Sequence, residues 1–213
     1  MREVKRYFPI FVMPTLIAFL IAFVIPFLLG LFLSFTEFRT VSDAQFVGFS
    51  NYINIFSSDQ TFLSSLGFTV AFALVSVVSI NLFAFLLALL LTRNIFGTKL
   101  FRTVFFMPNL IGGIVLGYIW QLIINGVLYN YGYSITSDPK FGFWGLVVLM
   151  NWQMIGYMMI IYIAGLQNVP TELIEAAKID GATARQTLFK VTIPMVMPSI
   201  TICMFLTLSN SFK

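Results

Sequence analysis

The side chains that could do chemistry gather at two places in the sequence. One is a polar stretch at positions 168–190, whose charges could dock against a partner. The other is the group Asn151-Trp152-Gln153, whose amides can pair with hydroxyls and whose ring can stack on a sugar. Histidine is absent and the one cysteine, Cys203, lies in an apolar run, so the chain lacks the residues for a disulfide, a metal site or acid–base catalysis. We therefore expect binding and docking, with no cofactor and no metal.

The composition of the 213-residue chain is that of a membrane protein. Hydrophobic residues make up 59% of it and charged residues only 9%, whereas soluble domains are about 25% charged. A helix of about 20 apolar residues crosses a hydrocarbon core of about 30 Å. We predict an all-α polytopic membrane protein with five spans. The five stretches are Phe8–Phe35, Gly67–Leu91, Val104–Leu128, Phe141–Gln167 and Val191–Ser211.

The basic residues predict how these spans are oriented. Residues 1–6 look like the start of a signal peptide, but the apolar run that follows exceeds the usual length of about 7–15 residues, so we expect a retained span. Cytoplasmic loops are enriched in Lys and Arg. Only Arg39 and Lys140 fall on one side, so the N-terminus and residues 168–190 are expected in the cytoplasm, and the charge needs no nucleic-acid partner. The basic residues on the cytoplasmic side are Arg2, Lys5, Arg6, Arg93, Lys99, Arg102, Lys178, Arg185 and Lys190.

The polar segment 168–190 predicts two short helices on the cytoplasmic face of the membrane. Pro170-Thr171 can begin the first, with Thr171 as its N-cap, and Gly181 can end it in the left-handed conformation. Thr183-Ala184-Arg185-Gln186 matches a capping box that begins the second. The helix of the fifth span can then begin at Pro194. A connecting loop with an interfacial helix explains the same residues equally well.

The spacing Glu175-Ala176-Ala177-x3-Gly181-x9-Val191-x-Ile193-Pro194 resembles the EAA loop of ABC-importer permeases. The family pattern is EAA-x3-G-x9-I-x-L-P, from which Val191 and Ile193 depart conservatively. In that family the loop forms a coupling helix that docks in a groove of the cytoplasmic ATPase. The resemblance implies ATPase coupling for Glu175, Ala176, Ala177, Asp180 and Gly181.

Further motifs extend the resemblance over most of the chain. Pro26-x7-Ser34-Phe35-Thr36, followed by Phe46-Val47-Gly48-Phe49-x-Asn51-Tyr52, is similar to the opening of maltose-F or lactose-F type sugar permeases. Arg102-x4-Phe106-Met107-Pro108 is similar to the start of their core domain. The implied fold is a type I transmembrane domain with six spans, of which five are present, so the chain looks truncated before the last. We expect an N-terminal part, residues 1–66, and a permease core, residues 67–213, that contains the coupling loop 168–190.

The resemblance also implies where a substrate passes, because the family's contacts cluster on the spans before and after the loop. The absence of charged residues from the spans points to a neutral solute. Polar groups between transmembrane helices also serve as hydrogen bonds that hold the helices together, and that alternative stays open for each of them. The assigned residues are Asn151, Trp152, Gln153, Gly156, Tyr157, Ser209 and Asn210, with Asn81, Asn109 and Trp120-Gln121 as further candidates.

The leading hypothesis is a permease subunit of an ATP-driven importer of a sugar or oligosaccharide, in a bacterial inner membrane. The resemblance implies four partners: a cytoplasmic ATPase dimer, a second permease subunit in a heterodimer, an extracytoplasmic solute-binding protein and the lipid bilayer. One alternative is a permease for glycerol phosphate or another polar metabolite. The other is a truncated remnant that inserts but does not transport.

Overall fold

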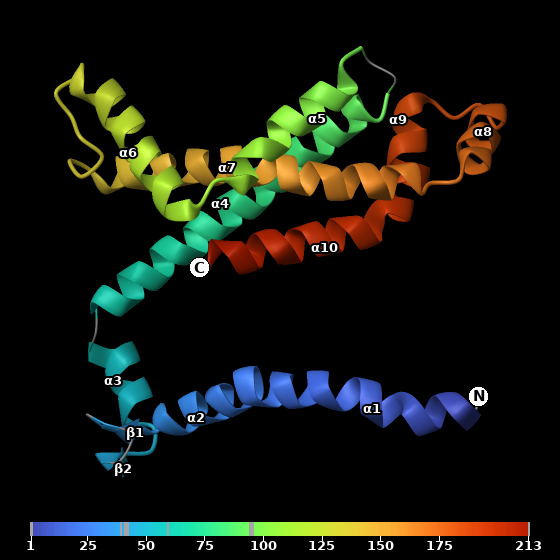
Figure 1. The fold of residues 1–213 in the computed structure, drawn as a ribbon. Coiled ribbons are helices and arrows are strands. Elements are labelled where there is room, and N and C mark those ends of the chain that lie inside the picture. Colours follow the sequence, from blue (N-terminus) through green and yellow to red (C-terminus); the bar gives the residue numbers. More distant parts are fainter. Residues whose placement is uncertain (1, 39, 41–42, 59, 94–95, 213) are drawn as a thin grey trace. The chain divides into compact units, whose positions relative to one another are not determined.

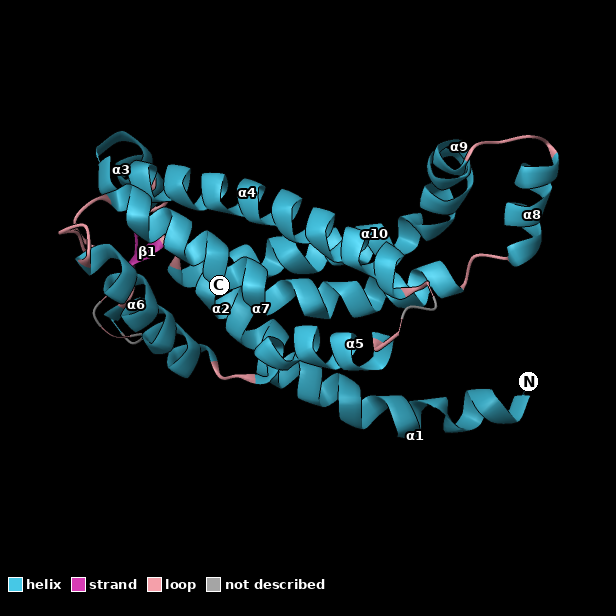
Figure 2. Ribbon diagram, turned by 90° about the horizontal axis from the view of Figure 1, so that it is seen from above, coloured by secondary structure: helices cyan, strands magenta, loops and turns pink. Residues whose placement is uncertain are grey.

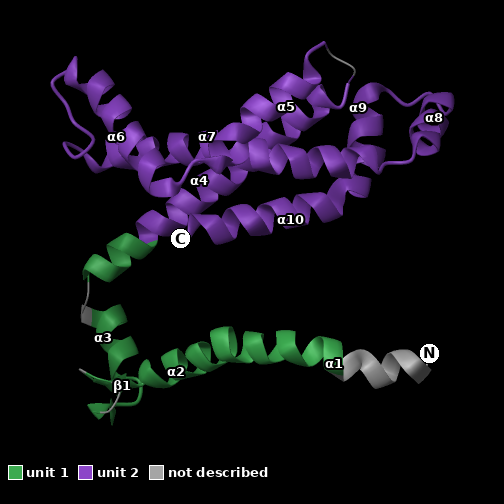
Figure 3. Ribbon diagram, viewed as in Figure 1, with its two compact units in different colours: residues 1–66 green, residues 67–213 purple. Residues whose placement is uncertain are grey.

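The computed structural model describes residues 2–38, 40, 43–58, 60–93 and 96–212, so Arg39 and Lys213 lie outside the described residues. The chain divides into two compact units, residues 1–66 and residues 67–213, which Figure 3 colours separately. Nearly all of the described structure is helical (Figure 2).

The first unit begins with one long apolar helical rod. It consists of α1 (Arg2–Phe19), a π-helical turn η1 (Leu20–Val24) and α2 (Ile25–Leu33). The stretch Ile10–Leu33 is long and apolar enough to cross a membrane, and none of its most apolar window is buried in the protein. An apolar surface all around a helix is typical of a span that faces lipid.

A small polar cap follows this rod and joins the two halves of the opening motif. The amide of Asn51 donates to the carbonyl oxygens of Ser34 and Thr36 at 3.1 and 3.0 Å. The hydroxyl of Tyr52 donates to Ser34 Oγ at 2.6 Å. These bonds fold the motif residues onto one another, which gives the motif a structural reason. The cap contains β1 (Thr36–Glu37), β2 (Gln45–Phe46), which pair antiparallel, and α3 (Ser50–Ser58).

The second unit is a helical bundle with α7 at its centre. α7 packs against α5, α6 and α10 (Figure 1). The long helix α4 begins in the last residues of the first unit and continues into this bundle. Its helices are α4 (Gln60–Leu91), α5 (Thr98–Phe106), the 3-10 turn η3 (Met107–Leu110), α6 (Gly113–Tyr129), α7 (Pro139–Gln167), α8 (Thr171–Ile179), α9 (Ala184–Thr187), the π turn η4 (Leu188–Thr192) and α10 (Ile193–Ser211).

The predicted third span, Val104–Leu128, does not form one continuous helix. The chain there forms two helical pieces, Thr98–Leu110 and Gly113–Tyr129, which meet at an angle of 101°. Pro108 lies in the 3-10 turn that ends the first piece, and Ile111 is extended at ψ 130°. The break itself follows the proline, where Ile111 and Gly112 both have extended backbone, with ψ of 130° and 135°. Four other helical stretches of the described chain are long and apolar enough to span a membrane, and the bent pair brings the number to five if it counts as one span.

The fifth span also begins earlier than its apolar pattern predicts. The helix is continuous from Ala184 to Ser211, so the second helix of the polar segment is the start of this span and not a separate short helix. A π turn at Leu188–Thr192 lies just before Pro194, as the π turn of the first span lies just before Pro26. A proline leaves the carbonyl four residues back without its donor, and one wider turn accommodates that loss without ending the helix.

Small side chains allow the bundle helices to approach closely. The buried face of α4 repeats at intervals of three and four residues and is mostly alanine, serine and aliphatic residues. On α7, a Cβ atom at Gly156 would overlap the carbonyl of Phe105 on α5. This contact fixes α5 against the centre of the bundle. The buried residues of α4 are Ala73, Ser76, Ile80, Ala84, Ala88 and Leu91.

Candidate functional site

The polar segment forms a helix that ends in a complete Schellman motif. Gly181 has φ +76°, in the left-handed region, and its N–H donates to the carbonyl of Lys178 at 3.1 Å. The N–H of Ala182 donates to the carbonyl of Ala177 at 2.9 Å. These two bonds are the pair that defines the motif, so the prediction that Gly181 ends the helix is confirmed.

The start of this helix differs from the prediction by one residue. Pro170 occupies the N-cap position without a side-chain hydrogen bond, and Thr171 is already helical, so Thr171 is not the N-cap. The capping box of the next helix is confirmed. Thr183 Oγ1 accepts from the N–H of Gln186 at 3.3 Å, and Gln186 Oε1 accepts from the N–H of Thr183 at 2.8 Å.

The helix α8 stands away from the bundle in both views (Figures 1 and 2) and has two unlike faces. Glu172, Glu175, Ala176 and Ile179 follow one another at helical spacing and are all exposed, Ile179 by 86%. We call these four residues the outer face. On the opposite side, Ile174 packs against the buried core.

The predicted coupling residues therefore divide between surfaces. Glu175 and Ala176 lie on the outer face, whereas Ala177 is half-buried and Asp180 and Gly181 form the exposed C-terminal turn. Ile179 is missed by the sequence reasoning. Helical spacing places this residue on the charged side of the helix. An isoleucine is unexpected there, and this mismatch is the signal that could have identified it.

A cavity of about 710 Å³ separates α8 from the ends of the bundle helices. Its walls include Leu89 of α4, Leu166 of α7, Ile174 of α8 and Leu188 of η4. Because α9 continues without a break into α10, a displacement of α8 can reach α10 through the Gly181–Thr183 turn and through the packing of α8 on α9 and η4.

A chain of hydrogen bonds ties three helices together inside the bundle. The hydroxyl of Tyr162 on α7 donates to Asn81 Oδ1 on α4 at 2.6 Å. The amide of Asn81 donates in turn to Thr207 Oγ1 on α10 at 2.9 Å. Both polar ends of the Asn81 side chain are thus committed within the protein, which favours the helix-joining explanation for this substrate-path candidate.

Asn151 differs from Asn81, because half of its amide has no partner. Its Nδ2 donates to the carbonyl of Val147 at 2.8 Å, while Oδ1 is buried and accepts no hydrogen bond from the described residues. Next to it, Trp152 is 43% exposed, and its ring lies 5.5 Å from that of Trp120 on α6. Gln153 and Tyr157 are half-buried.

Gly156, placed on the substrate path because a glycine could leave room for a sugar, does not leave open room beside these residues. The backbone of Phe105 fills the space in which its side chain would lie. On α10, Ser209 is exposed and Asn210 donates to the carbonyl of Leu206 at 2.8 Å. The end of α10 reaches the Asn151 region through Ser211, whose hydroxyl lies 3.9 Å from the sulfur of Met150.

Comparison with known proteins gives a family match over residues 80–213, to the model described as "Binding-protein-dependent transport system inner membrane component". The chain is 41% identical over 212 residues to the "Probable starch degradation products transport system permease protein AmyD" of Thermoanaerobacterium thermosulfurigenes, covering 96% of this chain and 72% of that protein. It is 30% identical to the "Multiple sugar-binding transport system permease protein MsmF" of Streptococcus mutans, covering 84% of this chain and 65% of that protein. The chain thus spans about two thirds to three quarters of the length of these relatives.

A solved structure shows the same fold. One chain of a bacterial ABC transporter involved in the import of the acidic polysaccharide alginate superposes with a TM-score of 0.78 at 22% identity. The superposition covers 99% of this chain and 75% of that one. A second structure, of the alginate transporter in complex with a pentasaccharide-bound periplasmic protein, gives a TM-score of 0.74 at 24% identity, covering 97% and 73% of the two chains.

Proposed function

This chain belongs to the family of binding-protein-dependent transport system inner membrane components, and from that premise we infer that it is a permease subunit of an ATP-driven sugar importer. It is a multi-pass component of the inner membrane. It is a transport subunit and not an enzyme, because its relatives are permease proteins and ATP hydrolysis in such importers belongs to another subunit.

The observation that carries the proposal is the outer face of α8. A short helix with Glu172, Glu175 and the 86% exposed Ile179 stands at the end of an apolar bundle, on the loop that resembles the family's coupling loop. In this proposal a cytoplasmic ATPase dimer docks on that face, with Glu175, Ala176 and Ile179 in contact and with Asp180 and Gly181 shaping the turn that follows. Ala177 packs toward the bundle.

Motion would pass from α8 to the spans through the backbone. α8 is joined to α10 by a short turn and a continuous helix, and α10 is joined to α4 and α7 by the Asn81–Tyr162–Thr207 bonds. ATP binding drives the switch only if the ATPase has different affinities for the two states of the permease. We infer that the docked ATPase favours one position of α8, and that the bundle changes between its two states together with α8.

The proposed cargo is a neutral sugar or oligosaccharide. The five apolar stretches predicted from the sequence hold no acidic or basic side chain that would serve an ion or an acid, and several relatives carry names of sugar permeases. We propose that Asn151, with its unpartnered Oδ1, and the exposed Trp152 contact the cargo, and that Gln153, Tyr157, Ser209 and Asn210 lie along its path.

One relative favours a second candidate. The chain is 32% identical over 166 residues, 73% of its length, to the "sn-glycerol-3-phosphate transport system permease protein UgpA" of Agrobacterium fabrum, covering 56% of that protein. A phosphate cargo needs cations along its path. The predicted apolar stretches supply none, and the basic residues of the span helices lie outside those stretches, so a second permease subunit would have to contribute them.

Three further partners and the orientation belong to the same proposal. A second permease subunit completes the pathway, an extracytoplasmic solute-binding protein delivers the cargo, and the bilayer surrounds the spans. The N-terminus and α8 face the cytoplasm, in line with the distribution of Lys and Arg.

Uptake by the assembled transporter tests the proposal. The chain is co-expressed with its ATPase, second permease and binding protein, and cells are offered labelled oligosaccharides and labelled glycerol phosphate. Oligosaccharide uptake that requires both ATP and this chain supports the proposal. Uptake of glycerol phosphate alone would replace the first candidate with the second.

A further inference from the structure

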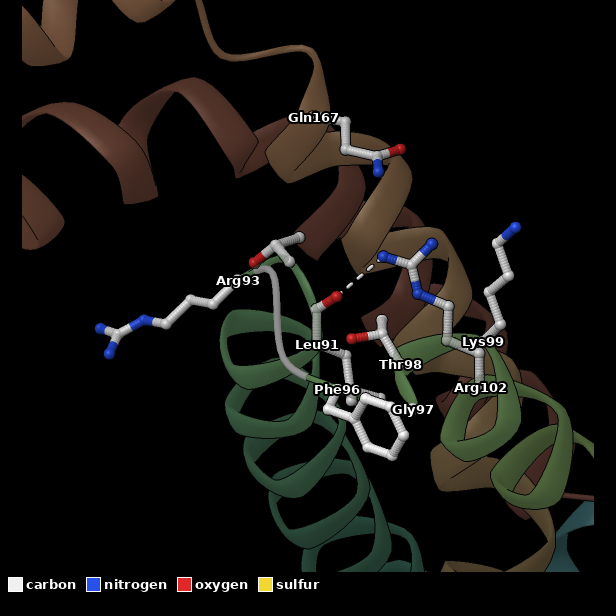
Figure 4. Close-up of a pocket in the computed structure, with 9 residues that line it drawn as sticks. Leu91, Arg93, Phe96, Gly97, Thr98, Lys99, Arg102 and Gln167 are labelled. Atoms are coloured by element: carbon white, nitrogen blue, oxygen red, sulfur yellow. Dashed lines mark hydrogen bonds between the residues drawn. The ribbon is translucent and has the colours of Figure 1, made fainter.

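A second cavity, of about 570 Å³, lies at the corner where α4 ends and α5 begins (Figure 4). Its walls come from the end of α4 with Leu91 and Arg93, the start of α5 with Lys99 and Arg102, and Gln167 at the end of α7. Three cationic side chains thus border one cavity. None of the described residues that line it carries a carboxylate.

Arg102 is only partly satisfied at this corner. Its Nη2 donates to the carbonyl of Leu91 at 2.8 Å, which caps the C-terminal end of α4 with a positive charge. Its Nε is buried and has no hydrogen-bond partner among the described residues. A guanidinium offers five donors, and the Nε–H of this one lacks the oxygen acceptor that a charged group could supply.

The surroundings of these cations are apolar and exposed. Phe96, beside the cavity in Figure 4, is fully exposed, and on α5 Leu100 is 66% exposed and Phe101 45%. Cations next to exposed aromatic and aliphatic side chains match a ligand that has a charged head and an apolar body. A small free anion would interact with the cationic side chains only and would make no contact that needs the apolar ones.

We propose that this α4–α5 corner binds an anionic phospholipid of the adjacent leaflet, with its phosphate at Arg102 and Lys99 and an acyl chain along Phe96 and Phe101. A phosphodiester supplies oxygen acceptors to the half-buried Arg102 side chain, and arginine recognises such groups with a planar fork of donors. A net negative headgroup is favoured because two more cations border the cavity. The proposal depends on the membrane setting of the family and not on the cargo of the importer.

Native mass spectrometry of the detergent-purified chain with defined lipids tests this proposal. Phosphatidylglycerol and phosphatidylcholine of equal chain length are compared, since both carry a phosphate and only the first has a net charge. We expect phosphatidylglycerol to bind at least tenfold better. Lys99→Gln should lower that preference by about fivefold, since one cation near the surface is lost. Lys140→Gln, an exposed lysine outside this cavity, is the matched control and should leave it unchanged.

Arg102→Gln would also remove the cap of α4, so Arg102→Lys is the informative change at that position. It keeps the charge but not the fork, and should bind less phosphatidylglycerol than the parent while eluting as the same species on gel filtration. The proposal would be overturned by equal binding of the two lipids, by an equal effect of Lys140→Gln, or by displacement of the lipid by inorganic phosphate, which marks a free-anion site. Displacement by the ATPase would also overturn it, in favour of a protein contact. None of these results bears on sugar uptake.

Discussion

The hydroxyl of Tyr162 donates to Asn81 Oδ1 at 2.6 Å, across a separation of 81 residues in the chain. The bond joins α7 to α4, and Asn81 extends it to Thr207 on α10. The helix α8, which we propose docks the ATPase, lies between α7 and α10 in sequence, so the two spans that flank it are tied to a third span at this point. We infer that α4, α7 and α10 move as one body when α8 is displaced.

Tyr162→Phe should therefore destabilise the bundle. The change leaves Asn81 Oδ1 without its partner, and hydrogen bonds between membrane helices contribute about 0.6 kcal/mol on average and up to about 1.7. Tyr118→Phe, at a 64% exposed tyrosine of α6, is the matched control and should change stability little. Reversible unfolding in mixed micelles measures both. Equal stability of the two variants would mean that the bond does not join the helices.

Gly156→Ala should be more damaging than its size suggests. The new methyl group would overlap the backbone of Phe105, which cannot turn aside as a side chain can, so a cost at the upper end of the usual range of about 1–3 kcal/mol is expected. Gly117→Ala is the control, because nothing lies within 4 Å of the added atom at that helical position. Thermal unfolding should separate the variants, and a neutral Gly156→Ala would contradict the close approach of α5 to α7.

Gly181→Pro should prevent recovery of the ATPase with the permease. Proline fixes φ near −65°, whereas Gly181 has φ +76°, and it also removes the N–H that bonds to Lys178. Gly132 is a close match as a control, since it too has φ +76° and donates its N–H within a loop, to Tyr129. Co-purification of the ATPase should fall at least tenfold for Gly181→Pro and stay near normal for Gly132→Pro. Equal losses would point to a general folding defect.

Asn151→Ala should impair uptake while leaving the bundle nearly as stable as before. Its Oδ1 has no partner to lose, and one hydrogen bond to a sugar hydroxyl is worth about 1 kcal/mol, or about fivefold in apparent affinity. The apparent KM of uptake and the unfolding midpoint are measured on the same variant. A lowered midpoint with an unchanged KM would assign Asn151 to helix packing.

Much of the fold could be predicted from local chemistry. The lengths of the apolar stretches were enough to predict most of the spans. The end of α8 at Gly181 and the capping box at Thr183 follow from backbone rules that act over a few residues. The bend at Ile111 and the continuous helix through Pro194 could not be read in the same way, because a helix that contains a proline can end soon after it, as after Pro108, or continue past it with a π turn, as at Pro194.

The candidate site shows the same division. The charged pattern of α8 indicated a docking helix, but which side faces the bundle depended on the packing of Ile174, and Ile179 was therefore missed. Asn81 and Asn151 look alike in sequence. They differ in the folded chain because Tyr162 and Thr207, far away in sequence, hydrogen-bond both ends of the Asn81 amide. The Oδ1 of Asn151 has no such partner among the described residues.

Cysteine labelling at Ile179 tests the central claim most directly. The native Cys203 is fully buried, so it should contribute little background labelling. Ile179→Cys then gives a labelling site on the outer face of α8. Tyr131→Cys, at a 74% exposed residue between α6 and α7, gives a labelling site on the side of the membrane opposite to α8 in this account. A membrane-impermeant maleimide should label position 179 only in inverted vesicles, and bound ATPase should protect it, while position 131 should react only from the outside of intact cells. Labelling of position 179 from the outside, or no protection by the ATPase, would contradict the account.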